Sequence, residues 1–371
     1  GGEGHGIIKI AERIKEVTAG LCPGQTDDER AAAVAEAVDR LKGSGLLAAH
    51  VPASLSGAGL SAGGVAEILR GLARRDGSLA QIPQSHFTFT RWLVDPALDS
   101  PSAEWAGRLV GGTLVANAQA EGPEPVVFQG GRLSGVKRWA SGSPYADVLA
   151  VTARRPGEAA QSLAAFVPAD RAGVEVADDF AAVGQSFTGS GTVRLDGVAV
   201  AEGEVREFAD AIALPAYGAT AQLYHAAIDV GLAEQAFYRA VELAGTPDPD
   251  DLTARLAGEL SSTLWAATSS LAAAAAAVDA LWGSRGAPTA KRVAASLAVA
   301  RARSVAAEAA LEITAGAFDL TGTRGTAPGA GLERAWRDAR THTLHGRRRE
   351  KLAQIGRAVL GGPVEPQGPQ F

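Results

Sequence analysis

The sequence predicts a mostly α-helical α+β fold in three parts: a helical domain over residues 1–112, a β-barrel or β-sandwich domain over 113–210, and a C-terminal helical bundle over 211–371. Apolar residues at helical spacing dominate the first part. Short apolar runs between glycine turns dominate the second, and long alanine-rich segments dominate the third. With 371 residues, 46% of them hydrophobic, the chain can bury a sizeable core.

The first part contains clear helix start signals. Thr26 followed by Glu29 is a capping-box pattern, and the apolar residues behind it predict a helix that ends at Gly43. A second helix is expected from Ser61. The stretch between them carries a G-x-G-x-x-A fragment, but neither a preceding strand nor a suitable acid accompanies it, so a loop is expected instead of a dinucleotide site.

The middle part reads as short strands with polar insertions. Residues 147–153 form a compact apolar run, whereas 173–176 and 192–195 alternate between apolar and polar residues. The insertions contain Asn117, Ser141 and the segment 185–191. Ordinary turn chemistry explains each of them when taken singly.

The last part predicts long helices near residues 218–244, 252–282 and 290–318, with GTPDPDD at 245–251 as the clear break. Small residues allow such helices to pack closely in a bundle. A binding crevice is expected where the β domain meets these helices.

Composition excludes several classes of protein. A net charge of -6 and a pI near 5.6 argue against general nucleic-acid binding. The single cysteine, Cys22, cannot form an intramolecular disulfide or a cysteine zinc site, which suits the cytoplasm. No phosphate loop, nucleophile elbow, zinc helix or membrane-length apolar run is present, and no metal site is expected.

The segment RAWRDARTHTLHG, residues 334–346, holds His342 and His345. Their spacing puts both imidazoles on one face of a helix, and imidazole suits proton transfer near neutral pH. A polar helix end whose cations satisfy terminal carbonyls is the alternative interpretation.

Several motifs together resemble the acyl-CoA dehydrogenase fold superfamily, and within it the flavin-dependent monooxygenase branch of dibenzothiophene monooxygenases and sulfur-acquisition oxidoreductases. They are QIPQSHFTF, GVKRWASGS, DDFAAVGQSFTGSGTV, YGATAQLYHAAIDVG and RAWRDARTHTLHG. The resemblance implies a helical domain, a β domain and a C-terminal four-helix bundle.

This resemblance implies a two-component monooxygenase. A separate reductase would supply reduced FMN by diffusion, and the chain would use O2 through a C4a-hydroperoxyflavin to oxygenate a small sulfur- or nitrogen-containing substrate. Two alternatives remain open: an acyl-CoA dehydrogenase-type oxidoreductase and a non-catalytic oligomeric paralogue. FAD is the alternative cofactor, and a homo-oligomer, most simply a tetramer, is expected.

The resemblance also implies site residues. His50 and His225 are interpreted as structural. The residues expected to line the flavin and substrate site and act in catalysis are His86, Asn117, Ser141, His342 and His345. Those expected to bind the cofactor are Asn117, Trp139, Ser141, Gln185, Ser186, Thr188, Ser190 and His345.

Two departures from the family pattern affect these expectations. In the late-position class of dehydrogenases a glutamate base follows the segment that matches RDARTHTLH, but here Gly346 holds that place and Glu350 lies four residues further on. A base must reach its proton directly or through one water, so dehydrogenation is disfavoured. The loop 245–251 is acidic where relatives carry basic and aromatic residues, which predicts weaker flavin binding.

Overall fold

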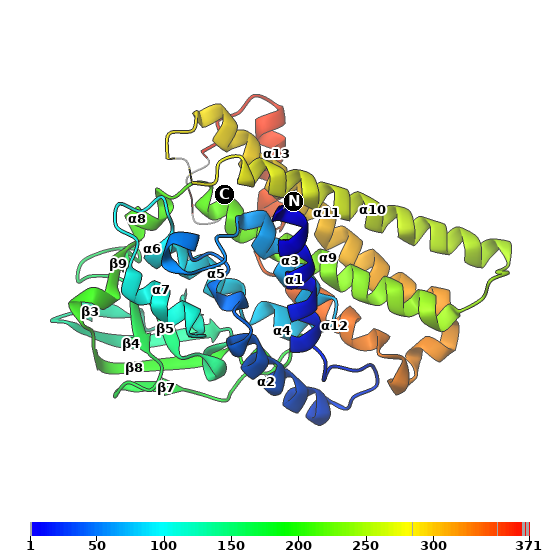
Figure 1. Ribbon diagram of the computed structural model, residues 1–371, viewed down its shortest axis with the longest axis horizontal. Coiled ribbons are helices and arrows are strands. Elements are labelled where there is room, and N and C mark those ends of the chain that lie inside the picture. Colours follow the sequence, from blue (N-terminus) through cyan, green and yellow to red (C-terminus); the bar gives the residue numbers. More distant parts are fainter. Residues whose placement is uncertain (1, 284, 347, 366–367, 369–370) are drawn as a thin grey trace.

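The structure is a computed structural model and describes residues 2–283, 285–346, 348–365, 368 and 371. The strands gather on one side of the molecule and the long helices extend to the other (Figure 1). The helices that precede the strands are α1 (Gly2–Val17), α2 (Asp27–Gly43), α3 (Ala62–Ala73), α4 (Gly77–Gln81), α5 (Gln84–Phe89), α6 (Arg91–Val94) and α7 (Ala103–Val110).

The predicted N-terminal signals are confirmed. The Thr26 hydroxyl accepts the Glu29 N–H at 3.2 Å and donates to the Glu29 carboxylate at 3.0 Å, and α2 ends at Gly43. Ser61 precedes the first residue of α3. The glycine-rich stretch between them is a loop with two short 3-10 helices, η1 (Leu46–Ala48) and η2 (Ala53–Leu55).

The β domain consists of two sheets. The first has the order β1-β5-β6-β9, in which β1 and β5 are parallel, and the second has the antiparallel order β2-β4-β8-β7 with β3 on β4. The strands are β1 (Val115–Ala118), β2 (Ala120–Glu121), β3 (Val127–Gln129), β4 (Arg132–Ala140), β5 (Val148–Ala153), β6 (Leu163–Pro168), β7 (Val174–Val176), β8 (Gly191–Ala199) and β9 (Val205–Glu207).

Strand β5 shows why the run 147–153 is continuously apolar. Its alternate residues point to opposite faces of the sheet. Leu149 and Val151 pack between the two sheets, whereas Val148 and Ala150 pack on the other face, in a cluster that contains Phe166 of β6 and Trp92 of α6. The first sheet is therefore covered on both faces, and it connects the β domain to the helices.

The C-terminal part is a bundle of long helices, as predicted. Short 3-10 helices occur in the β domain, η3 (Ser143–Tyr145) and η4 (Glu202–Glu204), and in the connection between α11 and α12, η5 (Gly322–Thr326) and η6 (Pro328–Ala330). The α-helices are α8 (Phe208–Ile212), α9 (Tyr217–Ala244), α10 (Asp251–Asp279), α11 (Thr289–Thr321), α12 (Leu332–His342) and α13 (Arg348–Val359).

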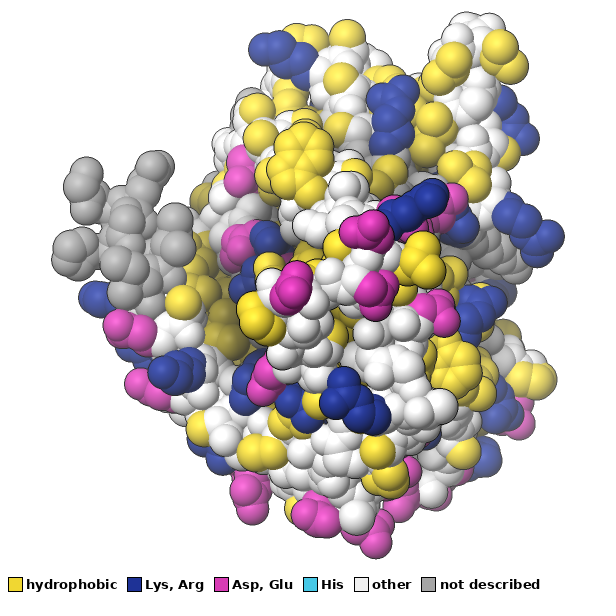
Figure 2. Space-filling model, turned by 90° about the vertical axis from the view of Figure 1, so that its right-hand side faces the viewer, with side chains coloured by type: hydrophobic (Ala, Val, Ile, Leu, Met, Phe, Trp, Pro, Cys, Tyr) yellow, Lys and Arg dark blue, Asp and Glu magenta, His cyan; other side chains and the backbone are white. Residues whose placement is uncertain are grey.

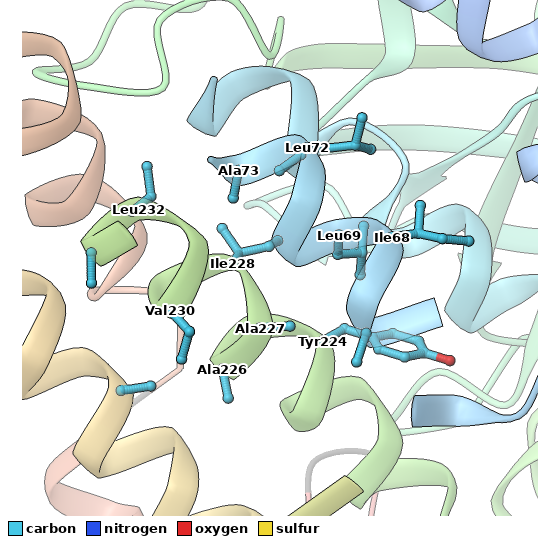
Figure 3. Packing of buried hydrophobic residues seen from close by; sticks show 14 of the residues in the cluster. Ile68, Leu69, Leu72, Ala73, Tyr224, Ala226, Ala227, Ile228, Val230 and Leu232 are labelled. Atoms are coloured by element: carbon cyan, nitrogen blue, oxygen red, sulfur yellow. The ribbon is translucent and has the colours of Figure 1, made fainter. Parts of the chain in front are cut away.

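Helix α9 is the centre of the main core. Figure 3 shows α3, with Ile68, Leu69 and Leu72, beside α9, with Tyr224 and Ile228, and all five side chains belong to one buried cluster. These side chains are fully buried, and each such burial contributes about 1.5–3 kcal/mol relative to an exposed side chain. This packing holds the first half of α9 in place beside the β domain. Among the described helices, none is long and apolar enough to cross a membrane.

Candidate active site

A cavity of about 490 Å³ lies where α5, the β domain, α9 and the turn after α12 meet. This is the crevice that the sequence predicts between the β domain and the bundle. Its polar lining includes Asn117 and Ser141 from the β domain, His225 from α9 and His345 from the turn after α12. Its volume lies within the range of small-molecule sites.

Three histidines form a cluster at the bundle side of this cavity. His342 Nε2 lies 3.0 Å from His225 Nδ1, and the His225 and His345 rings stack with centroids 5.5 Å apart and planes at 19°. Helix α12 ends at His342, and a turn closed by the His345 N–H to the His342 carbonyl brings the two rings to 5.3 Å. His225 and His345 line the cavity, whereas His342 is fully buried behind them.

A buried ion pair supports the cluster. Asp229 accepts a hydrogen bond from His342 Nδ1 at 2.6 Å and pairs with Arg303 of α11. Arg303 also donates to the His345 carbonyl at 2.7 Å, so one guanidinium connects both histidine-bearing segments. Although burial opposes ionisation, His342 and Arg303 hold the pKa of Asp229 below its usual value.

The imidazoles are neutral near pH 7. Burial lowers the pKa of His345 to about 3, with His342 and Arg303 as further causes. Burial also lowers the pKa of His225 well below its usual value, and it lowers the pKa of His342 despite the opposing effect of Asp229. Neutral rings can both donate and accept protons, which a permanently charged ring cannot.

The β-domain side of the cavity presents hydroxyl groups. Ser141 lines the cavity, and its Oγ lies 2.6 Å from Ser190 Oγ, which lies 2.7 Å from Thr188 Oγ1. Thr188 donates to the Gln185 carbonyl at 3.1 Å. Thr188 uses its single proton on Gln185, so two arrangements of the remaining protons are possible. In the first, Ser190 donates to Thr188 and Ser141 donates to Ser190, which leaves a Ser141 lone pair facing the cavity. In the second, Ser190 donates to Ser141, and the Ser141 proton is free to donate into the cavity.

Trp139 lies at the mouth of the cavity. Its side chain is 64% exposed, and its φ of 53° is unusual for a bulky residue. The residue occupies an irregularity in the pairing of β4 with β8, and among the described residues its ring has one aromatic neighbour, Phe180. The indole therefore offers a large apolar face beside the cavity.

The segment 185–191, for which the resemblance implies cofactor binding, is not part of the cavity lining, and its role in binding stays a prediction. Gln185 is buried against α4 and α12: its N–H donates to Asp338 at 2.7 Å and its side chain to the Gly77 carbonyl at 3.1 Å. A Cβ at Gly184 would lie 2.0 Å from the Arg337 carbonyl, so the approach to α12 requires glycine. The Ser186 side chain is exposed, and Thr188 and Ser190 reach the cavity only through Ser141.

His86 is also placed differently from the prediction. It is fully buried outside the cavity lining, its Nε2 lies 2.7 Å from the Leu47 carbonyl, and its Nδ1 accepts the Val115 N–H at 3.0 Å. Both ring nitrogens are thus used to connect η1 to β1. The catalytic role expected for His86 stays a prediction, and the observed contacts are those of a residue that connects two segments.

Sequence reasoning missed three residues of the cluster: His225, Asp229 and Arg303. His225 was interpreted as structural, yet it lines the cavity. The signal that could have found it is the spacing of His225 and Asp229, which places both side chains on one face of α9. Their contact with His342 joins positions more than a hundred residues apart, and local patterns carry no such information.

Among the described residues that line the cavity, Glu121 is the only carboxylate. It is held in an ion pair with Arg154 at 2.6 Å, and this pair together with Gln161 lowers its pKa in spite of burial. Gly346 lines the cavity where the dehydrogenase base is expected, and Glu350 is an exposed residue of α13. The lining therefore lacks a carboxylate suited to act as a strong base.

Comparison with known proteins identifies the family of the chain. The acyl-CoA dehydrogenase C-terminal domain family matches residues 223–348. A dibenzothiophene monooxygenase from Mycolicibacterium goodii is 31% identical over 90% of this chain and 89% of its own length. The probable FMNH2-dependent monooxygenase SfnC of Pseudomonas putida is 28% identical over 61% of this chain and 62% of its own.

Among solved structures, TdsC from Paenibacillus sp. A11-2 in complex with FMN and indole superposes with a TM-score of 0.88. It is 26% identical and covers 99% of this chain and 100% of its own. A methanesulfinate monooxygenase from Pseudomonas fluorescens shares the fold, with a TM-score of 0.84. This chain therefore belongs to the flavin-dependent monooxygenase branch of the acyl-CoA dehydrogenase fold superfamily, together with the dibenzothiophene monooxygenases.

Proposed function

We propose that this protein is the oxygenase component of a two-component flavin-dependent monooxygenase that uses reduced FMN and O2 to oxygenate a small sulfur-containing compound. Two electrons and two protons from reduced FMN, together with one O2, give one oxygen atom on the substrate and one water. A separate reductase supplies the reduced flavin. The observation that carries the proposal is a cavity with two neutral imidazoles and a serine hydroxyl, and with Gly346 in place of a carboxylate base.

The residues at the cavity fit a flavin. Asn117 lines it with a side-chain amide that has no hydrogen-bond partner within the described part of the chain, so the amide can bind the polar edge of the ring. Trp139 offers an open aromatic face, and Ser141 and His345 offer groups that donate or accept. When bound, reduced FMN supplies the electrons that activate O2.

The chain's own residues then have distinct tasks. Ser141 and His345 place hydrogen-bonding groups at opposite sides of the cavity, where negative charge on oxygen can be stabilised. Thr188 and Ser190 orient the Ser141 hydroxyl from behind. Gln185 and Asp338 anchor this segment to α12, so they act by position and not by contact with the substrate.

The protein also has features that suit an oligomer in the cytoplasm. We propose a homotetramer formed through the C-terminal helices, because large apolar side chains on α9 and α10 are exposed: Tyr238 (57%), Leu252 (79%) and Trp265 (72%). Figure 2 shows one end of the bundle, where apolar groups lie between charged ones. Light scattering that shows a monomer at micromolar concentration would contradict the proposal.

The function can be tested with the purified protein, reduced FMN and ¹⁸O2, using dibenzothiophene as a first sulfur probe. We expect one labelled oxygen atom in the product and saturable FMN binding by fluorescence titration. Oxidation of an acyl-CoA without oxygen incorporation would support a dehydrogenase instead. Absence of FMN binding in the titration would favour a non-catalytic paralogue.

A further inference from the structure

The buried side of the histidine cluster is more elaborate than hydrogen-bonding to a ligand requires. Three side chains from two helices, His225 and Asp229 of α9 and His342 of α12, form one continuous chain of hydrogen bonds that starts at the cavity and ends at a buried carboxylate. His342 and Asp229 are fully buried. Neither of them lines the cavity, and the hydrogen bond that links them to a cavity-lining side chain is the one between His342 and His225.

The hydrogen bonds define where each proton lies. Asp229 is ionised and can only accept, so His342 carries its proton on Nδ1. Nε2 of the neutral His342 is then an acceptor, and the 3.0 Å contact places a proton on His225 Nδ1. Nε2 of His225 is left with its lone pair, and it has no partner among the residues that the structure describes.

We propose that Asp229, His342 and His225 form a proton relay that presents His225 Nε2 to the cavity as a proton acceptor and returns the proton when water forms. His225 is the proton-transfer residue, and His342 and Asp229 are positioning residues. The inference rests on the proposed oxygenase function and adds to it a residue with a defined protonation state.

The proton balance of the relay is simple. When His225 Nε2 takes a proton from the cavity, its Nδ1 proton can pass to His342 Nε2, so the two rings share one positive charge next to Asp229. No other bond forms or breaks, and the reverse transfer returns the proton. Arg303 pairs with the same carboxylate and keeps Asp229 ionised. His345 is the other titratable ring that contacts His225 and His342.

The substitution Asp229→Asn should change which ring nitrogen of His342 and of His225 carries the proton. Arg303 donates to one oxygen of Asp229, so the carbonyl of an asparagine would face Arg303 and its NH2 group would face His342 Nδ1. His342 would then carry its proton on Nε2 and donate to His225 Nδ1. The proton of His225 would move to Nε2, so the cavity would meet a donor in place of an acceptor. The same logic governs a carboxylate that orients a catalytic histidine.

Solid-state ¹⁵N NMR of histidine-labelled protein without flavin distinguishes the two ring nitrogens of neutral imidazole. The signals are assigned with His225→Gln and His342→Gln. We expect both rings to be protonated on Nδ1 in the wild type and on Nε2 in Asp229→Asn. Glu234→Gln is the matched control, because Glu234 is a buried carboxylate of the same helix that pairs with Arg70 and Arg74 instead. It should leave both signals unchanged.

A second measurement links the relay to turnover. In Asp229→Asn, product formed per reduced FMN should fall by roughly tenfold or more, and hydrogen peroxide should rise. The relay would be overturned if wild-type His225 carried its proton on Nε2, or if the tautomers did not change in Asp229→Asn. The first of these outcomes can be read from the wild-type spectrum even if the variant does not fold. Reversed tautomers with unchanged product yield would also overturn it. Because the NMR result needs no flavin, a failed oxygenation assay would refute the proposed function separately.

Discussion

The molecule contains two groups of buried histidines that differ in what surrounds their ring nitrogens. In the N-terminal helices, His86 has both nitrogens bound to backbone, and His50 lies 2.6 Å from the Tyr224 hydroxyl and 3.4 Å from the Leu60 carbonyl. In the cluster, His225 and His345 line the cavity, and the His345 ring nitrogens have no partner in the described part of the chain.

The pKa shifts do not separate these groups. Burial lowers the pKa of His50 to about 3 and that of His86 to about 4, much as it lowers the pKa of His345 to about 3. The difference lies in the unused nitrogens. A histidine whose nitrogens are both engaged connects segments, whereas one that leaves a nitrogen open toward a cavity can exchange protons. This comparison shows that a perturbed pKa marks a functional residue only together with geometry.

The largest expected effect comes from removing a hydrogen-bonding group at the cavity. His345→Ala and Ser141→Ala should each lower product formed per reduced FMN about a hundredfold and release hydrogen peroxide instead, because one such donor is worth roughly 2.7–4 kcal/mol in comparable sites. Both products can be measured in one stopped assay. Flavin affinity and the unfolding midpoint should change little.

Glu350→Gln is the control for that experiment, because it removes the carboxylate that lies four residues after Gly346 and leaves the residues that line the cavity unchanged. It should leave the product yield unchanged. If it abolished activity while His345→Ala did not, a dehydrogenase with Glu350 as its base would become the better assignment.

The structural group should respond in stability instead. His86→Ala leaves the buried Val115 N–H and Leu47 carbonyl without partners, so we expect a loss of roughly 3 kcal/mol in the free energy of unfolding. His225→Ala, at a half-buried position, should cost about 1 kcal/mol. Urea unfolding measures both. A normal midpoint for His86→Ala combined with lost oxygenation would restore the catalytic role that the sequence suggested.

The last prediction is a pH dependence of stability, to which His50 and His86 both contribute. The unfolded chain binds protons on its histidines below about pH 6.5, but His50 and His86 stay neutral in the folded protein until about pH 3 and about pH 4. The unfolded state therefore holds more protons between these values, and stability falls as the pH is lowered, by about 1.4 kcal/mol per pH unit for each such histidine. Calorimetric melting temperatures between pH 7 and 5 test this, and a flat profile would contradict it. In His86→Ala the slope should be shallower.

The sequence predicted the parts of the molecule that depend on local patterns. The capping pair Thr26 and Glu29, the apolar run of β5 and the three long helices α9, α10 and α11 each carry their own signal within a short stretch. The motif that contains His342 and His345 correctly indicated the part of the bundle that borders the cavity. These features need no knowledge of distant contacts.

The parts that it did not predict depend on contacts between distant segments. Gln185 is predicted to bind the cofactor, but it forms hydrogen bonds to Gly77 of α4 and Asp338 of α12 and lies outside the cavity lining. The sequence suggested a structural role for His225, and only the three-dimensional structure shows that its ring contacts His342. Whether a polar residue faces a ligand or another segment is decided by packing, and periodicity does not report it.

Gly346 has a consequence for how this enzyme could evolve. Its φ is +74°, and a side chain there would have space, since the nearest atom to an added Cβ is Gln222 Oε1 at 3.7 Å. A single-base codon change could give glutamate or aspartate, but the left-handed backbone costs an ordinary residue about 1–2 kcal/mol, while aspartate tolerates it better. Aspartate is therefore better tolerated at position 346 than a dehydrogenase-like glutamate. The left-handed backbone at Gly346 thus disfavours the substitution that would place a dehydrogenase-type glutamate base in this cavity.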